Sequence, residues 1–237
     1  MSESIVVNCD CMEYMHRVPD KAFDLAVVDP PYFSGPERRG YYGSRVSKIG
    51  VHRDYPISPQ WDIPGTEYFV ELQRVAKHYI VWGCNYFDYH FAPGRIVWDK
   101  CNSSSSFSDC ELAATDLFTS VRIFRFMWNR MLQGKSIEEG TIMQGNKKLN
   151  EKRIHPTQKA VALYRWLFQN YAKPGNRILD THLGSGSSRI AAYDAELDFV
   201  GCEIDPTYFK LQEERFNEYT AQQSLFVMEG RMNDEQI

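Results

Sequence analysis

Residues 177–205, RILDTHLGSGSSRIAAYDAELDFVGCEID, decide the fold class of this chain. A short apolar run ends in Asp180, a turn with Gly184 and Gly186 follows, and a helical pattern leads to a second apolar run that ends at Glu203. Strand, glycine turn, helix and strand in this order are typical of a parallel α/β unit. An acidic residue about twenty positions after the turn can accept hydrogen bonds from ribose hydroxyls. The stretch therefore predicts a site for a nucleoside-bearing cofactor.

The glycine pattern narrows the choice of cofactor. A dinucleotide fingerprint has a third glycine three positions after Gly186, where this chain has Arg189. Pyrophosphate binding and nicotinamide chemistry are therefore disfavoured. Asp205, two positions after Glu203, strengthens the ribose interpretation. The pattern is weak by itself, because many parallel sheets use such a turn simply to begin a helix.

Apolar runs and amphipathic stretches alternate along the rest of the chain. This alternation predicts an α/β fold with a doubly wound, seven-stranded, mostly parallel sheet, in a single domain over residues 1–237. The expected strands are 5–8, 24–29, 79–83, 95–99, 121–128, 177–180 and 198–205. The expected crossover helices lie within 66–78, 157–173 and 187–196.

Two long polar segments do not fit the alternation, and loops of such length in a compact domain are usually functional or disordered. Residues 36–60 carry five basic and two acidic residues, and residues 121–155 carry eight basic and three acidic residues. We therefore expect a mobile loop at 33–60 and a basic segment at 121–154, which together could form a surface for a polyanion, although solvated basic loops are about as common. The Ser-rich run 103–106, which precedes FSDCELA, is most simply a surface loop.

Composition limits the function classes. The chain has 237 residues, 43% of them hydrophobic and 24% charged, and a formal net charge of -4. No apolar run approaches a membrane span, and the start MSESIVVNCDC lacks the pattern of a secretory signal, so we expect a soluble, cytoplasmic protein without a membrane partner. The six cysteines are expected to be reduced thiols, and their spacing predicts no metal site.

Residues 27–35, VVDPPYFSG, place an acidic residue at the end of a buried-looking strand. Carboxyl ends of strands are where open α/β sheets bind ligands. The Asp29 carboxylate and the rigid Pro30 carbonyl would provide two adjacent acceptors, which suits an amino group with two donors. Pro31 restricts the backbone further, and Tyr32 offers a flat surface for stacking a ring. The sequence therefore predicts a site that binds the amino group of a base.

Together, four segments resemble the S-adenosylmethionine-dependent amino methyltransferases of DNA, in the group whose catalytic motif precedes its cofactor motif. These segments are DPPY (29–32), HPTQK (155–159), LDTHLGSGS (179–187) and VGCEIDPTYF (200–209). The resemblance covers nearly the whole chain. It implies a class I methyltransferase fold of the Rossmann-like kind, with permuted motif order and with the strand before the glycine turn beside the strand before DPPY. DPPY resembles the adenine-N6 form, whereas cytosine-N4 enzymes more often have Ser first.

The resemblance also implies roles for individual residues. Segment 8–15, NCDCMEYM, resembles the motif that lies near the cofactor adenine. The implied catalytic residues are Asp29, Pro30, Pro31 and Tyr32. The implied cofactor-binding residues are Asp10, Cys11, Asp29, His155, Thr157, Lys159, Asp180, Thr181, Gly184, Ser185, Gly186, Glu203 and Asp205. Two positions depart from the family, which usually has Pro where this chain has Thr181 and Ala160.

These features predict an adenine-N6 DNA methyltransferase that uses S-adenosylmethionine. Its partner would be double-stranded DNA with the target base flipped onto Tyr32, and a homodimer could share recognition. For such an enzyme, residues 33–60 would be a target-side loop and residues 121–154 a short DNA-recognition insertion. The expected DNA-binding residues are Arg38, Arg39, Arg45, Lys48, Arg53, Lys147, Lys148, Lys152 and Arg153. Cytosine-N4 or RNA amino methylation is the nearest alternative. From another class, a nucleic-acid binding module with a vestigial cofactor pocket stays open.

Overall fold

The computed structural model describes residues 2–33, 43–46, 52–57, 63–102, 108–129 and 132–234. Its main-sheet strands are β1 (Ser4–Val7), β2 (Phe23–Val28), β5 (Ala76–Trp82), β6 (Gly94–Asp99), β7 (Cys110–Thr115), β8 (Val121–Arg125), β11 (Arg177–Asp180) and β12 (Asp198–Cys202). Two short hairpins are formed by β3 (Gly43–Val46) with β4 (His52–Tyr55), and by β9 (Trp128–Asn129) with β10 (Leu132–Gln133). The helices are α1 (Cys11–Met15), α2 (Thr66–Val75), η2 (Cys84–Tyr86), η3 (Lys147–Leu149), α3 (Val161–Tyr171), α4 (Ser187–Asp194) and α5 (Pro206–Asp234).

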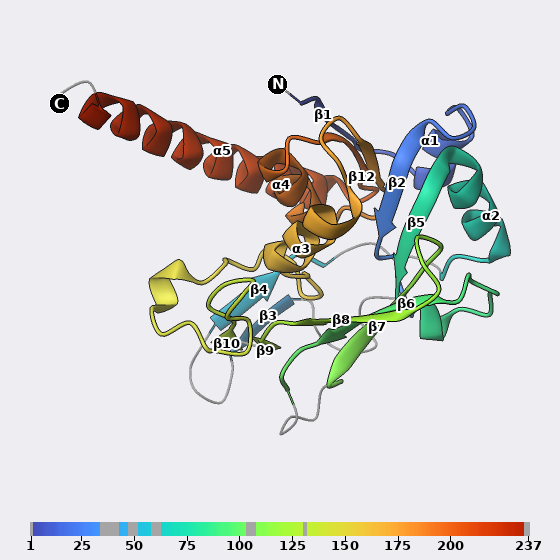
Figure 1. Ribbon diagram of the computed structural model, residues 1–237, viewed down its shortest axis with the longest axis horizontal. Helices are drawn as coiled ribbons and strands as arrows, with labels where there is room; N and C mark the ends of the chain where they lie inside the picture. The colour runs from blue at the N-terminus through green and yellow to red at the C-terminus, as the bar shows by residue number, and fades with distance from the viewer. Residues whose placement is uncertain are drawn as a thin grey trace.

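The main sheet has the strand order β1-β12-β11-β2-β5-β7-β6-β8 within the described residues (Figure 1). All neighbours pair in parallel except β7, which runs antiparallel to both β5 and β6. The predicted α/β class with a mostly parallel sheet is confirmed. The winding reverses between β11 and β2, because the chain moves outward from each of them in opposite directions. Their carboxyl ends therefore form the crevice where such sheets bind ligands.

The predicted number of seven strands is wrong, because β7 makes the described sheet eight-stranded. No strand is predicted at these positions from the sequence, since CELAAT has a polar start and no β-branched residue before Thr115. Ala113 and Ala114 are fully buried between neighbouring strands. Ala113 belongs to the apolar cluster on the α3 side of the sheet, and Ala114 to the cluster on the α2 side. Tertiary packing therefore overrides the weak strand propensity of this segment.

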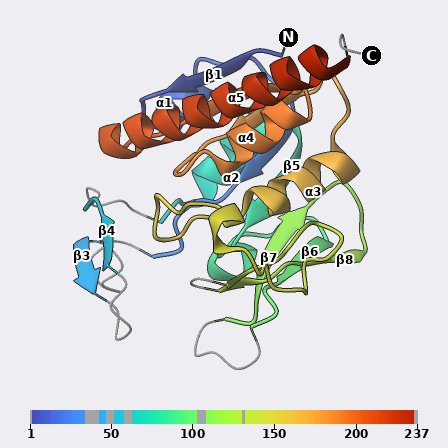
Figure 2. The same cartoon turned by 90° about the vertical axis from the view of Figure 1, so that its left-hand side faces the viewer.

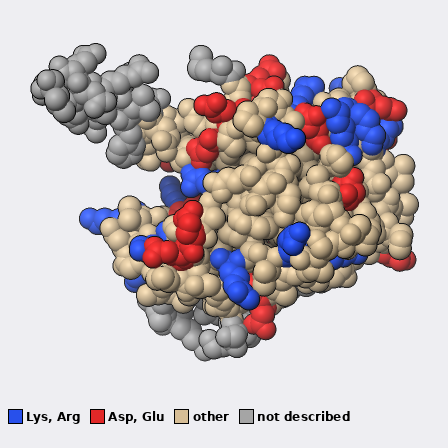
Figure 3. Space-filling view, in the orientation of Figure 1, with Lys and Arg blue, Asp and Glu red and all other residues tan. Residues whose placement is uncertain are grey.

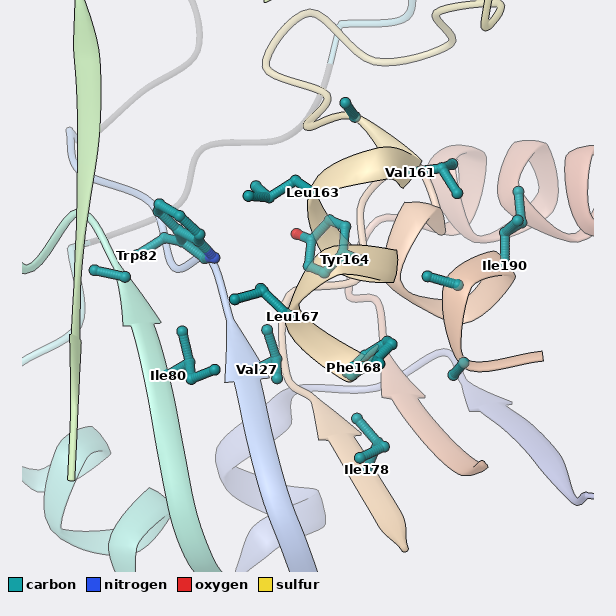
Figure 4. Close-up of a cluster of buried hydrophobic side chains, with 14 of the residues drawn as sticks. Val27, Ile80, Trp82, Val161, Leu163, Tyr164, Leu167, Phe168, Ile178 and Ile190 are labelled. Carbon is teal, nitrogen blue, oxygen red and sulfur yellow. The ribbon is translucent and has the colours of Figure 1, made fainter. Parts of the chain in front are cut away.

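Helices cover both faces of the sheet. Successive side chains along β2 and β5 point to opposite faces, and toward the carboxyl ends of these strands both sets are apolar and buried. Val27 and Ile80 point toward α3, where Leu167 is fully buried against them (Figure 4). The next residues along the two strands, Val28 and Val81, lie in a second cluster with side chains of α1 and α2. Two apolar layers therefore hold the strand that ends at Asp29.

The β3–β4 hairpin lies to one side of the main sheet, within the predicted target-side loop (Figure 2). Tyr55 packs against Tyr208 of α5, whose hydroxyl donates a 3.0 Å hydrogen bond to the Pro56 carbonyl. The carboxyl end of the predicted mobile loop is therefore packed against α5. Residues 34–42, 47–51 and 58–60 lie outside the described part of the chain.

Helix α5 packs on α4 through Phe216 and then extends away from the rest of the molecule (Figure 1). Among the described helices, none combines the length and the apolar character that a membrane span requires.

Candidate active site

A cleft of about 1210 Å³ opens at the carboxyl edge of the sheet, above β11 and β2. It brings together motifs that lie about 150 residues apart in the sequence. The predicted site residues along its wall are Asp10, Cys11, Asp29, Pro30, Pro31, Tyr32, Arg153, His155, Thr157, Lys159, Thr181, Gly184, Ser185 and Glu203.

Both oxygens of the Asp29 carboxylate accept hydrogen bonds within the cleft. The Tyr32 hydroxyl donates to Oδ1, and the Lys159 ammonium donates to Oδ2 at 2.6 Å. Lys159 Nζ also lies 3.2 Å from the Tyr32 hydroxyl. Its side chain is only 5% exposed, so this ion pair is shielded from water. Lys159, expected beside the cofactor, therefore lies on the carboxylate that is expected to bind the base.

A second carboxylate, Glu111, lies on the other side of the Lys159 ammonium. Its Oε2 is 2.7 Å from Lys159 Nζ, and its Oε1 accepts a hydrogen bond from Lys100. Sequence reasoning missed both Glu111 and Lys100. Because β7 runs antiparallel to β6, the beginning of β7 lies at the carboxyl edge of the sheet, with Glu111 opposite Trp98. The sequence does show Glu111 as an acidic residue at the start of an apolar run. It could be assigned to the site only with knowledge that β7 runs antiparallel to β6.

Burial and charge act in opposite directions on these groups. Burial raises the pKa of Asp29 above its ordinary value, although Lys159 opposes the shift. Burial also acts to raise the pKa of Glu111, but the ammonium groups of Lys159 and Lys100 outweigh it and hold that pKa below its ordinary range. The two carboxylates raise the pKa of Lys159 despite its burial. Asp29 is therefore the carboxylate better suited to accept a proton.

The ring of Tyr32 is positioned by an aromatic wall and by a glycine. It stacks on Tyr86 with 5.0 Å between ring centroids and an interplanar angle of 16°. Phe87 meets it edge-on at 6.1 Å. Gly83 has φ +70°, and a Cβ atom there would lie 2.0 Å from the Tyr32 ring. Only glycine therefore fits the turn after β5 with Tyr32 in this position.

We expect Gly83→Ala to destabilise the fold by more than the roughly 1–2 kcal/mol that a left-handed backbone costs a non-glycine residue. The added methyl group must displace Tyr32 as well as strain the backbone. Gly175→Ala is the matched control, because Gly175 has φ +81° and no atom within 4 Å of its added Cβ. Urea unfolding should show the larger loss for Gly83→Ala, and equal losses would contradict the proposed fit of Tyr32.

The glycine turn and Glu203 form the opposite wall of the cleft. Gly184 has φ +54°, and the nearest atom to an added Cβ is the His182 carbonyl oxygen at 4.0 Å, so the turn leaves open space. The Glu203 carboxylate accepts hydrogen bonds from the backbone N–H groups of Gly184, at 2.8 Å, and Asp205, at 2.9 Å. Burial raises the pKa of Glu203 to about 7. These bonds fix the carboxylate directly beside the turn.

Three predicted cofactor residues lie outside the wall of the cleft. Asp180 accepts hydrogen bonds from Ser188 Oγ at 2.6 Å and from the His182 N–H at 3.1 Å, and burial raises its pKa to about 7. Gly186 caps α4 with φ +73°. Asp205 accepts from the N–H groups of the first turn of α5. These residues support the turn and the helix starts, so the structure gives them positions behind the site.

The amino-terminal and HPTQK segments close the remaining sides of the cleft. Asp10 caps α1 by accepting from the Met12 and Glu13 N–H groups at 2.8 and 3.2 Å. The His155 ring packs edge-on against Tyr208, with 4.4 Å between centroids, and burial lowers its pKa to about 4. His155 is therefore a neutral wall residue at neutral pH.

The two departures from the family pattern have local explanations. Thr181 Oγ1 lies 2.6 Å from the Tyr68 hydroxyl of α2 and 2.9 Å from His182 Nδ1, bonds that proline could not make. Ala160 caps α3 with φ -68°, which is also the angle of proline, and its side chain is fully buried. The first departure adds a link from α2 to the turn, and the second leaves the backbone unchanged.

The expected DNA-binding residues are distributed over three places. Lys147 and Lys148 lie in η3 and are exposed, as is Lys152. Figure 3 shows basic and acidic side chains together on the flank where Figure 1 places the segment between β10 and α3. Arg153 stacks on Trp128 at 4.2 Å and lines the cleft. Arg45 and Arg53 pair in register across β3 and β4. The remaining predictions, Arg38, Arg39 and Lys48, lie outside the described residues.

Among the described residues, no group of three or more His, Cys, Asp or Glu side chains could hold a metal ion. The described cysteines are free thiols.

The chain is similar in sequence to known methylases. A family model described as DNA methylase, of the N6/N4 methyltransferase type, matches residues 115–214. The resemblance to the N6/N4 DNA methylases is confirmed. The type II methyltransferase M.HinfI of Haemophilus influenzae is 23% identical over 244 residues, which cover 90% of this chain and 68% of that protein. The putative methylase YubD of Escherichia coli (strain K12) is 25% identical, with 95% and 94% covered.

Solved structures of methyltransferases share the fold. The complex of M1.HpyAVI with S-adenosylmethionine has a TM-score of 0.51 and 17% identity, covering 89% of this chain and 98% of that chain. The cytosine-N4-specific PvuII DNA methyltransferase has a TM-score of 0.54 and 12% identity, covering 92% of each chain. At this identity the likeness establishes the fold alone. The family model and the two relatives show that the chain is similar to DNA amino methyltransferases of the N6/N4 type, and they do not distinguish the two target atoms.

Proposed function

We propose that this chain transfers a methyl group from S-adenosylmethionine to N6 of an adenine that is flipped out of duplex DNA. The observation that carries the proposal is the position of Asp29 and Pro30 on the wall of the same cleft as Gly184 and Glu203. One side of the cleft suits an amino group, and the other suits a nucleoside with a ribose.

The chemistry of the far wall fits the cofactor. Gly184 leaves open space beside Glu203, and a side chain at this position would project into the space proposed for the cofactor. The Glu203 carboxylate accepts from two backbone N–H groups and has further lone pairs that can accept from ribose hydroxyls. Asp10, at the start of α1, lies on the same cleft. When bound, S-adenosylmethionine supplies an electrophilic methyl group on a positively charged sulfur.

The near wall would activate the amino group. The exocyclic nitrogen of adenine is a poor nucleophile, because its lone pair is delocalised into the ring. Hydrogen bonds from its two N–H groups to the Asp29 carboxylate and the Pro30 carbonyl would localise that pair and orient it. Asp29 would also stabilise the positive charge that develops on nitrogen and take up the proton that leaves. Its raised pKa suits this second role.

The first test separates an enzyme from a vestigial binding module. Purified protein is incubated with duplex DNA, or with RNA, and S-adenosylmethionine labelled in its methyl group, and the nucleic acid is digested to nucleosides. We expect label in N6-methyl-2′-deoxyadenosine. Label in N4-methyl-2′-deoxycytidine or in RNA would assign the nearest alternatives, and binding of the cofactor without any transfer would refute the enzymatic proposal.

The exposed η3 segment is proposed as part of the DNA surface. Replacing Lys147 and Lys148 together by Ala should weaken DNA binding and flatten the slope of log affinity against log salt by about 1.8, at about 0.9 for each lost phosphate contact. Cofactor affinity should be unchanged. Fluorescence anisotropy of labelled duplex DNA over a salt series measures both quantities.

The matched control is the double variant Lys77→Ala/Lys173→Ala. Lys77 lies at the amino end of β5 and Lys173 precedes β11, so both are at the edge of the sheet opposite the cleft. This control removes the same charge and should keep the wild-type salt slope. Identical slopes for the two double variants would exclude η3 from the interface.

A further inference from the structure

The Asp29 carboxylate, which must accept an N–H group of the base in the proposed function, has both oxygens engaged when no base is present. Tyr32 donates to one oxygen and Lys159 to the other. The Lys159 ammonium also lies 5.5 Å above the centre of the Tyr32 ring. The ring is further stacked on Tyr86, so both the acceptor and the stacking surface are partly occupied by the protein. A base that approaches Asp29 Oδ2 therefore competes with the Lys159 ammonium for this carboxylate.

Glu111 offers Lys159 a second partner at almost the same distance. Lys159 Nζ is 2.6 Å from Asp29 Oδ2 and 2.7 Å from Glu111 Oε2. Glu111 Oε2 is buried, and no described group donates an aligned hydrogen bond to it, despite its ion-pair distance from the ammonium. Glu111 Oε2 therefore faces the Lys159 ammonium and already shares it with Asp29. Its other oxygen is held by Lys100 at the end of β6, which keeps the carboxylate in place.

We propose that Lys159 is a latch on Asp29, and that Glu111 is the positioning residue that receives the Lys159 ammonium when the amino group of the target base arrives. The inference rests on the proposed function and deepens it. No covalent bond forms or breaks in this exchange: one N–H of the ammonium leaves Asp29 Oδ2 and turns to Glu111 Oε2, and an N–H of the base takes its place. Because Glu111 lies within ion-pair distance from the start, the ammonium never loses a carboxylate partner.

The charges around Lys159 keep the free-energy cost of this exchange low. Asp29 and Glu111 carry two negative charges, and Lys159 and Lys100 carry two positive charges. The cluster is therefore neutral before and after the exchange, and no isolated charge is left in a buried site. The other titratable groups that act on Asp29 are Tyr32 from its own loop, Asp180 from β11 and Tyr164 from α3.

Opposite effects of the two partners on the pH profile test the latch. In Lys159→Gln, Asp29 loses its cation, so the acidic limb of the methyl-transfer rate should move upward by about one to three pH units. In Glu111→Gln, Lys159 stays on Asp29, so the acidic limb should move downward by about one pH unit. The maximal rate of Glu111→Gln should also fall about tenfold, because release of the latch becomes harder.

Three controls accompany these variants. Lys159→Arg keeps the positive charge and should keep the acidic limb near that of the wild type. Lys77→Gln removes a lysine from an exposed ion pair with Asp24 and should leave the profile unchanged. Thermal unfolding and S-adenosylmethionine affinity identify any variant that fails to fold. If Lys159→Gln does not fold, the pH profile of Lys159→Arg is compared with that of the wild type instead.

Shifts in the same direction for Lys159→Gln and Glu111→Gln, or no shift for either, would overturn the latch while the wild type methylates DNA. A shift for Lys159→Arg as large as that for Lys159→Gln would also overturn it. Absence of any transfer by the wild type would instead overturn the proposed function, so the two failures are distinguishable.

Discussion

Asp29→Ala should abolish methyl transfer, with a loss on the order of 10³-fold or more, while S-adenosylmethionine still binds within about threefold of its wild-type affinity. The carboxylate lies on the wall assigned to the base. On the opposite wall, Glu203 accepts from the Gly184 and Asp205 N–H groups. Removal of this carboxylate should therefore lower the rate of methyl transfer to the amino group and change cofactor affinity only weakly. Single-turnover transfer and calorimetric titration with the cofactor measure the two quantities.

Two further variants sharpen this comparison. Asp29→Asn keeps the shape of the side chain and removes only the charge, so it should lose nearly as much rate as Asp29→Ala. Asp24→Asn is the matched control, because Asp24 lies on the same strand at its other end and pairs with Lys77. It should retain wild-type transfer. A loss of cofactor affinity equal to the loss of rate would place Asp29 in the wrong role.

Gly184→Val should have the opposite profile, with cofactor affinity reduced by about 100-fold or more, equivalent to about 2.7 kcal/mol. A branched side chain would project into the open space that the turn leaves beside Glu203. The substitution also places a β-branched residue at φ +54°, which strains the backbone wherever it occurs.

Gly175→Val separates these two effects. Gly175 has φ +81° in an exposed turn before β11, so valine there introduces comparable strain without approaching the cleft. Both variants should be less stable than the wild type, but only Gly184→Val should lose the cofactor. Wild-type cofactor affinity in a folded Gly184→Val protein would refute the assignment of the turn.

The fold followed from the sequence wherever periodicity and turn chemistry agreed. The run that ends at Asp180, the glycine turn and the run that ends at Glu203 predicted β11, α4 and β12 closely. β7 was missed because its alanines have little strand propensity, and only their burial between β5 and β6 makes them a strand. A strand that forms because of its neighbours in the sheet need not show a strand pattern in its own sequence.

The site residues that belong to a sequence motif could be predicted. Those that reach the site only through the direction of a strand could not. Asp29 and Gly184 were found from short segments, and the parallel pairing of β2 with β11 brings them to one edge. Glu111 and Lys100 reach the same edge only because β7 runs antiparallel to β6. Lys159 was found, but its contact with Asp29 joins positions 130 residues apart and could not be deduced from either segment.

The central claim, that Asp29 directs a methyl group to N6 of adenine in DNA, is tested most directly in cells that lack DNA methylation of their own. Genomic DNA from such cells expressing the wild type or Asp29→Asn is digested, and the methylated nucleosides are measured by mass spectrometry. The account predicts N6-methyl-2′-deoxyadenosine with the wild type and none above background with Asp29→Asn. N4-methyl-2′-deoxycytidine as the product of the wild type, or equal N6-methyl-2′-deoxyadenosine from both proteins, would contradict it.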